Sequence, residues 1–122
     1  MALSYSDATF DYVLTSDTLE HVPDFDIGLA EIRRVLKPGG RHIFTIPVLW
    51  DRPTRQRAAL VGGKIVHHLP PSYHGEAGAE EYLVFNEFGG DVVERIEAAD
   101  FDVRIERDVA NPLIATFVCT KR

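Results

Sequence analysis

The chain has 122 residues, of which 45% are hydrophobic, and this is enough for one small domain with a buried core. Its formal net charge of −6 at pH 7 argues against nucleic acid or an anionic membrane as a partner. The single cysteine, Cys119, cannot form an intramolecular disulfide and fits a reducing compartment, so we expect a cytoplasmic protein. We expect neither a signal peptide, because residues 1–7 are polar, nor a membrane span, because no apolar run approaches ~18 residues.

Residues 10–14 form a short apolar run that predicts a buried strand. The run contains aromatic and β-branched side chains and lacks a helical period. Thr15, Ser16 and Asp17 follow it directly, at the carboxyl end of the strand, which is where open α/β sheets bind their ligands. An ordinary core strand with a polar exit would show the same pattern, so spacing alone leaves both interpretations open.

Residues 25–36 carry apolar side chains at helical spacing and predict an amphipathic helix. Asp24 is a suitable N-cap, and Pro38 ends the helix before Gly39-Gly40 turns the chain. Residues 41–48 are then typical of a second strand. A strand, a helix and a strand in this order predict a parallel pair joined by a right-handed crossover.

Three motifs in this region resemble class I S-adenosylmethionine-dependent methyltransferases. They are Phe10-Asp11-Tyr12-Val13, Leu19-Glu20-His21-Val22 and Leu36-Lys37-Pro38-Gly39-Gly40. Together they are similar to strand 4, helix D and strand 5 of that family. The resemblance covers nearly the whole chain, but it covers only the second half of the family's domain. The family's Gly-rich turn after strand 1, and the acidic residue that follows strand 2, have no counterpart in this sequence.

The resemblance implies an α/β fold: a partial Rossmann-like methyltransferase sheet with strands in the order 4-5-7-6, flanking helices and a lid-like insertion. It implies methyl transfer from S-adenosylmethionine to an unidentified small-molecule acceptor in the complete enzyme. This chain alone would bind S-adenosylmethionine weakly or not at all, because most of the cofactor contacts belong to the other half. Two alternatives stay open: a truncated, non-catalytic domain that self-associates, and a ligand-binding module without turnover.

The rest of the chain divides into two parts. Residues 49–85 are longer than a simple connection and predict a lid or substrate region, with a short helix over 54–60 and a strand over 64–69. Asn86 is a suitable N-cap for a helix over 87–99, and two strands follow over 101–109 and 113–120. We therefore expect one incomplete domain over residues 1–122, with its core at 10–48.

Candidate site residues follow from the resemblance, residue by residue. It implies that Thr15, Ser16, Asp17 and Leu19 line the cofactor's methionine part. His21 and Asp17 are the catalytic candidates, His21 because its unperturbed pKa lies near neutrality. The alternative for His21 is a histidine at a helix entry that bonds to the backbone.

Acceptor-binding candidates come from the loops. Glu20 is suited to position an amine or hydroxyl, Tyr73 and His74 lie in an irregular loop, and Arg52 can bind an anionic group. A solvated loop is the plain alternative for these charged side chains.

The histidines of the insertion also raise the question of a metal. His67 and His68 are adjacent, so a strand would turn them to opposite faces and only one could join His74. The sequence pattern offers no carboxylate or cysteine to complete a tetrahedral set, and we therefore expect no metal.

The predicted first strand would lie at an open sheet edge, because the family's strand 1, which pairs with it, is absent from this chain. An open apolar edge recruits another chain. We therefore expect a homodimer in which two Phe10–Ser16 strands pair antiparallel across a two-fold axis.

Overall fold

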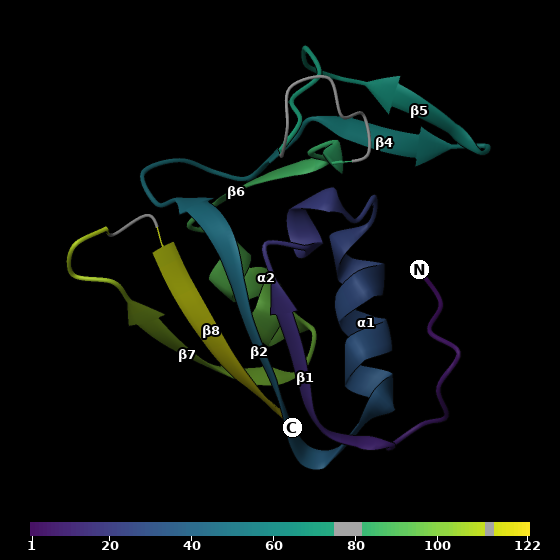
Figure 1. Cartoon of the computed structure of the whole chain (residues 1–122), viewed down its shortest axis with the longest axis vertical. Helices are drawn as coiled ribbons and strands as arrows, with labels where there is room; N and C mark the ends of the chain where they lie inside the picture. Colours follow the sequence, from purple (N-terminus) through teal and green to yellow (C-terminus); the bar gives the residue numbers. More distant parts are fainter. Residues whose placement is uncertain (75–81, 112–113) are drawn as a thin grey trace.

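The computed structural model describes residues 1–74, 82–111 and 114–122. Strand β1 (Phe10–Ser16), helix α1 (Phe25–Val35) and strand β2 (Leu36–Leu49) follow one another, with a 3₁₀ turn, η1 (Leu19–His21), before the helix (Figure 1). The Asp24 side chain accepts a hydrogen bond from the Ile27 backbone N–H, as expected of an N-cap. The strands β1 and β2 are parallel, so the predicted β-α-β unit is confirmed.

The central sheet has the order β1-β2-β8-β7. Strand β8 (Ile114–Lys121) runs antiparallel to β2, and β7 (Phe101–Arg107) runs antiparallel to β8. This is the order 4-5-7-6 that the family resemblance implies. The predicted final strand was expected to begin at Leu113, which lies outside the described residues.

A short strand, β6 (Asn86–Gly89), continues the sheet beyond the carboxyl end of β1. It pairs in parallel with the last residues of β2, Val48↔Phe88 and Leu49↔Gly89, and β3 (Arg55–Gln56) pairs antiparallel with β6. The predicted helix over 87–99 is therefore too long: the observed helix α2 covers Val92–Ala98.

Side-chain contacts explain why the chain is extended at 86–89. Asn86 does not cap a helix, because its amide nitrogen donates to the Val22 carbonyl. Phe88 is buried in the core, and a Cβ atom on Gly89 would overlap the Arg52 carbonyl oxygen. Tertiary packing thus overrides the local preference for a helix.

The predicted short helix over 54–60 is wrong. That segment contains β3 and the strand β4 (Ala58–Val61), which forms a hairpin with β5 (Lys64–His67). Gly62 and Gly63 turn the hairpin with φ of +57° and +77°, which glycine adopts readily and which suits a two-residue hairpin loop. Figure 1 shows this hairpin beyond the carboxyl ends of β1 and β2.

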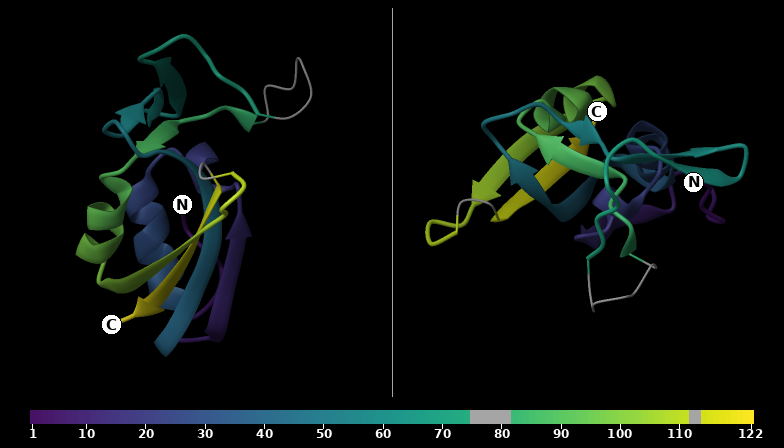
Figure 2. Two further views of the ribbon diagram at one scale, coloured as in Figure 1. Left: turned by 90° about the vertical axis from the view of Figure 1, so that its left-hand side faces the viewer. Right: turned by 90° about the horizontal axis from the view of Figure 1, so that it is seen from above.

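Both helices cover the same face of the central sheet (Figure 2). Alternate residues of β2, among them Phe44, Ile46 and Val48, face them and are buried with Phe25 and Ile96. On the opposite face, which no described element covers in Figure 2, the β1 side chains Tyr12 and Leu14 are 59% and 71% exposed. Among the described residues, no helix has the length and apolar character that crossing a membrane requires.

Candidate functional site

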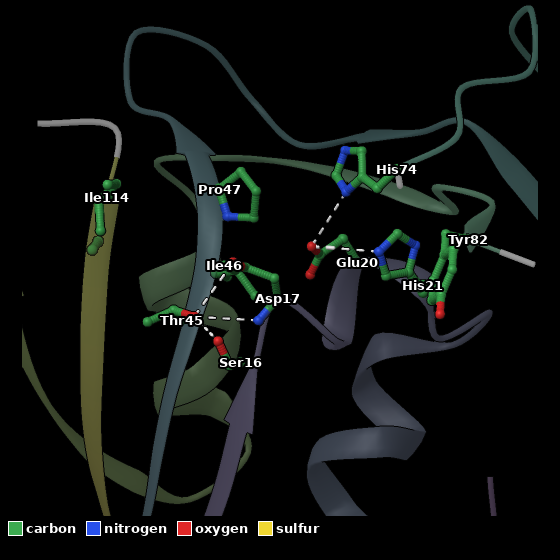
Figure 3. Close-up of a pocket in the computed structure, with 11 residues that line it drawn as sticks. Ser16, Asp17, Glu20, His21, Thr45, Ile46, Pro47, His74, Tyr82 and Ile114 are labelled. Carbon is green, nitrogen blue, oxygen red and sulfur yellow. Dashed lines mark hydrogen bonds and ion pairs between the residues drawn. The ribbon is translucent and has the colours of Figure 1, made fainter. Parts of the chain in front are cut away.

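A cavity of about 650 Å³ lies at the carboxyl ends of β1 and β2 (Figure 3). Both parallel strands, the 3₁₀ turn, the insertion and the start of β8 contribute to its walls. The lining residues are Ser16, Asp17, Glu20, His21, Thr45, Ile46, Pro47, His74, Tyr82, Ile114 and Ala115. The position agrees with the general rule that open α/β sheets bind ligands at this edge.

One wall of the cavity is a polar turn at the end of β1. The Asp17 backbone N–H donates to the Thr45 carbonyl at 3.0 Å, and the Thr45 hydroxyl donates to the Asp17 carboxylate at 3.3 Å. The Ser16 and Thr45 hydroxyl oxygens are 3.2 Å apart. Asp17 has φ of +45°, a left-handed conformation that aspartate tolerates better than most residues. These bonds hold the Asp17 side chain at the cavity edge.

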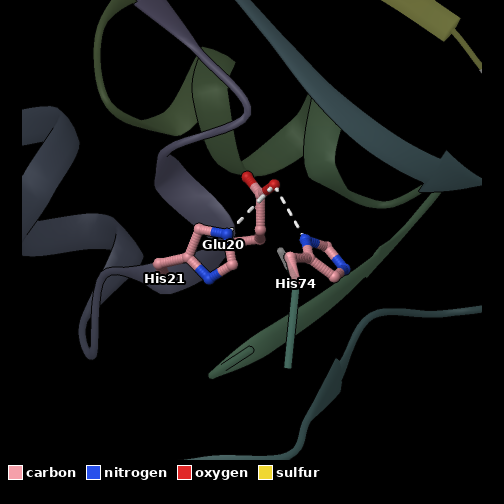
Figure 4. A group of neighbouring side chains, drawn as sticks. All are labelled: Glu20, His21 and His74. Atoms are coloured by element: carbon pink, nitrogen blue, oxygen red, sulfur yellow. Dashed lines mark ion pairs between the residues drawn. The ribbon is translucent and has the colours of Figure 1, made fainter. Parts of the chain in front are cut away.

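The opposite wall holds three ionisable side chains that we call the Glu20 cluster: Glu20, His21 and His74. The Glu20 side chain is only 2% exposed, and neither carboxylate oxygen accepts a hydrogen bond. Its Oε1 atom lies 3.6 Å from His21 Nε2 and 3.6 Å from His74 Nδ1 (Figure 4). Burial raises the pKa of the Glu20 carboxyl above its ordinary value.

A pair of antiparallel segments brings the cluster together. The His74 backbone N–H donates to the Tyr82 carbonyl at 2.9 Å, and the Val84 backbone N–H donates to the Ser72 carbonyl at 2.8 Å. The same segment presents the Leu83 carbonyl to His21 Nδ1 at 2.9 Å. A carbonyl oxygen only accepts, so Nδ1 of His21 carries the proton and Nε2 faces Glu20. His21 therefore bonds to the backbone and lines the cavity at once.

The candidate residues from the sequence separate into two groups. Ser16, Asp17, Glu20, His21 and His74 all line the cavity. Four others do not, and each has a different environment. Thr15 Oγ1 lies 3.0 Å from His42 Nε2, Leu19 is 1% exposed in the core, Arg52 pairs with Asp51 at 3.1 Å, and Tyr73 forms a bridge with Leu83.

Sequence reasoning missed several lining residues. The carboxyl-end rule that selected Ser16 and Asp17 also applies to the second strand, and it would have found Thr45 and Pro47. No local signal marks Tyr82, which reaches the site through tertiary structure. The carboxylate beside His74 was also missed, because Glu20 lies far from His74 in the sequence and its burial cannot be read from the pattern.

Sheet order and cavity position together define a Rossmann-like α/β protein with a cavity at the carboxyl ends of its parallel strands. Residues 1–44 match the family model described as a methyltransferase domain. The ubiquinone/menaquinone biosynthesis C-methyltransferase of Paraburkholderia xenovorans is 33% identical over 82 residues, which are 66% of this chain and 33% of that protein. The demethylmenaquinone methyltransferase of Bacillus subtilis is 51% identical over 43 residues, which are 35% of this chain and 18% of that protein.

Solved structures agree at the level of the fold. A putative S-adenosylmethionine-dependent methyltransferase from Listeria monocytogenes has a TM-score of 0.66 at 16% identity, over 98% of this chain and 65% of that one. The 1,6-didemethyltoxoflavin-N1-methyltransferase of Burkholderia thailandensis, solved with S-adenosylhomocysteine, has a TM-score of 0.60 at 22% identity. The match covers 96% of this chain and 46% of that one. The family model over residues 1–44 and these relatives make the chain similar to class I S-adenosylmethionine-dependent methyltransferases. The chain matches about a third or less of the length of the two curated relatives.

Proposed function

We propose that this chain forms the acceptor-side half of a class I methyltransferase domain that methylates a small molecule. The observation that carries the proposal is the cavity at the carboxyl ends of β1 and β2, where Asp17 stands on one wall and the Glu20 cluster on the other. The relatives named above support a transfer reaction, and the demethylmenaquinone methyltransferases suggest quinol-like acceptors for the first assays.

The polar end of β1 fits the amino-acid part of S-adenosylmethionine. Ser16 and Asp17 offer an exposed hydroxyl and an exposed carboxylate at the cavity edge, and Thr45 fixes their positions. When bound, S-adenosylmethionine supplies an activated methyl group on a sulfonium, so the protein's main task is to align the acceptor with it. Because this sequence has no Gly-rich turn for the rest of the cofactor, we expect tight binding only in a complete domain.

The Glu20 cluster would accept the proton that the acceptor loses. In the transfer, the bond from sulfur to methyl breaks, the bond from methyl to acceptor forms, and the sulfonium becomes a thioether. An acceptor that holds a proton must release it, and His21 Nε2 lies at the cavity wall while Nδ1 bonds to the Leu83 carbonyl. A positioned base of this kind contributes about 10²–10⁴-fold to a rate.

The proposal is tested in a chimera that supplies the first half of a methyltransferase domain. The chain is joined to the first half of the Bacillus subtilis relative's domain, and transfer of labelled methyl from S-adenosylmethionine to reduced quinols and hydroxylated aromatics is measured. We expect transfer by the chimera, about 10²-fold slower transfer in the His21→Ala variant, and a marked loss in Asp17→Ala. His67→Ala, on the exposed strand β5, is the matched control and should leave the rate unchanged.

Calorimetric titration of S-adenosylmethionine into the 122-residue chain accompanies this assay and should give weak or no binding. A folded chimera without transfer to any acceptor would contradict the proposal. Equal rates in the His21→Ala and His67→Ala chimeras would contradict the choice of site. If the folded chimera transfers no methyl group, the self-associating, non-catalytic domain becomes the better interpretation.

A further inference from the structure

The donor atoms of the Glu20 cluster face one another without a hydrogen bond between them. When the His21 ring is neutral, its proton sits on Nδ1 and bonds to the Leu83 carbonyl, so that Nε2 and Glu20 Oε1 are both acceptors. They face each other at 3.6 Å, which is too long for a hydrogen bond. His74 Nδ1 lies at the same 3.6 Å from the same oxygen. A buried carboxylate whose two oxygens lack any hydrogen bond needs a positive partner, since an unpaired buried charge is strongly unfavourable.

We propose that Glu20, His21 and His74 bind a divalent transition-metal ion of the Zn²⁺, Co²⁺ or Fe²⁺ type. The three donor atoms lie within 4.8 Å of one another. A tetrahedral ion with ligand bonds of about 2.1 Å separates its donors by about 3.4 Å, close to the two observed separations of 3.6 Å. The His74 side chain is 45% exposed and can rotate, so it can bring its nitrogen to the distance that the ion requires.

The surroundings of the cluster match those of known metal ligands. A ligating histidine usually donates its second ring N–H to a carbonyl or carboxylate, and His21 donates Nδ1–H to the Leu83 carbonyl. The Glu20 backbone is fixed in turn, because its carbonyl accepts from the Phe85 N–H at 2.9 Å. Two of the three donors are therefore held in place before an ion arrives.

The donor set selects among cations. Two imidazole nitrogens and one carboxylate suit Zn²⁺, Co²⁺ and Fe²⁺, whereas Mg²⁺ and Ca²⁺ prefer oxygen ligands alone. Three protein ligands leave at least one coordination position open, and the cavity lies beside it. If the proposed methyl transfer holds, an ion there would lower the pKa of an acceptor hydroxyl and replace His21 as the base, because His21 Nε2 would then be a ligand. Metal binding itself does not depend on that reaction.

The test measures metal binding by the 122-residue chain without tag or cofactor. Co²⁺ titrations followed by visible absorption, with Zn²⁺ displacement by calorimetry, should give one ion per chain. Mn²⁺ should bind more weakly than Co²⁺, and Mg²⁺ should not compete. Affinity should fall as the pH is lowered, because the ligating imidazoles must be neutral.

Variants identify the ligands. Glu20→Gln, His21→Gln and His74→Gln should each weaken Co²⁺ binding by at least about tenfold and change the absorption bands. His67→Gln and His68→Gln, both on exposed positions, should change neither. His74→Gln keeps the test valid if the buried Glu20 variant fails to fold, since the His74 side chain is 45% exposed. Absence of saturable Co²⁺ binding, or binding that only His67→Gln or His68→Gln removes, would overturn the metal site and would leave the methyl-transfer proposal untouched.

Discussion

His42 is a buried histidine on β2 that the proposed chemistry does not use. Its side chain is fully buried, its ring stacks on Phe44 with centroids 4.3 Å apart, and Nε2 lies 3.0 Å from the Thr15 hydroxyl oxygen. Burial lowers the pKa of His42 to about 3, because a charged imidazolium has no solvent or anion beside it. The folded protein therefore holds this ring neutral where the unfolded chain would protonate it.

This difference predicts how stability depends on pH. Below the unfolded pKa of about 6.5 the unfolded state binds one more proton than the native state, so stability falls as the pH falls towards 3. Between pH 6.5 and pH 5 the contribution is a loss of about 1.6 kcal/mol in the free energy of unfolding. Urea denaturation at several pH values should show this slope, and His42→Phe should flatten it. His67→Gln should keep the slope, and an NMR titration in which the His42 ring protonates near pH 6.5 would contradict the argument.

At the residue scale, the sequence predicted the location of the site better than the orientation of its side chains. The family motif and the carboxyl-end rule together selected Ser16, Asp17 and His21, which line the cavity. They also selected Thr15, but strand alternation turns its hydroxyl towards His42. The burial of Glu20 could not be predicted, because it arises from residues 82–85, which are distant in the sequence.

At the element scale, the extended segment at β6 depends on one glycine. A Cβ atom at Gly89 would overlap the Arg52 carbonyl oxygen. The backbone N–H of Gly89 donates to the Thr54 hydroxyl, which holds the two segments together. The sequence pattern favoured a helix here, because the apolar spacing of Phe88, Val92 and Ile96 is helical. The close approach of residues 52–54 is tertiary information that this spacing does not contain. Helix α1 was predicted because its cap and its periodicity agree, and the 41–48 part of β2 was predicted as a strand. Residues 36–40, which were expected to end the helix and turn the chain, instead begin β2.

Two glycine substitutions should therefore have opposite effects. Gly89→Ala forces the backbone near Arg52 to move and should lower the free energy of unfolding by about 3 kcal/mol. Gly28→Ala lies inside α1, where the new methyl would meet Val22 and Met1 atoms at 3.4 and 3.8 Å, which is ordinary contact. It should keep or raise stability, by up to about 1 kcal/mol, since alanine is the better helix former. Urea denaturation checks both, and equal effects would show that the close approach at Gly89 is relaxed in solution.

At the scale of the whole molecule, the sheet has an exposed edge and an exposed face. Among the described residues, β1 pairs only with β2, so its other side carries unpaired backbone groups. Leu14 and Tyr12 add apolar surface on the face that lacks helices. Parallel sheets are ordinarily covered on both faces, so these two surfaces favour association.

We predict a homodimer in which two β1 strands pair antiparallel. Light scattering should give the mass of two chains. Leu14→Lys adds a charge to a side chain that is 71% exposed, so it should leave the monomer fold intact while shifting the mass towards one chain. Ile65→Lys, on the hairpin strand β5 and 50% exposed, is the matched control and should remain dimeric. A wild-type chain that stays monomeric at high concentration would contradict the prediction.

The position of β8 in the sheet has a consequence for biosynthesis. Strand β2 pairs with β8 from Arg41↔Thr120 to Pro47↔Ile114, so partners in the middle of the sheet are separated by most of the chain. Such non-local pairing slows folding, because a long loop must close before the contacts form. A ribosome adding about 5–20 residues per second needs roughly 4–14 s to pass from β2 to the end of β8. During that interval the β8-facing edge of β2 has no partner in the nascent chain, and a chaperone that shields this edge would raise the yield of folded protein.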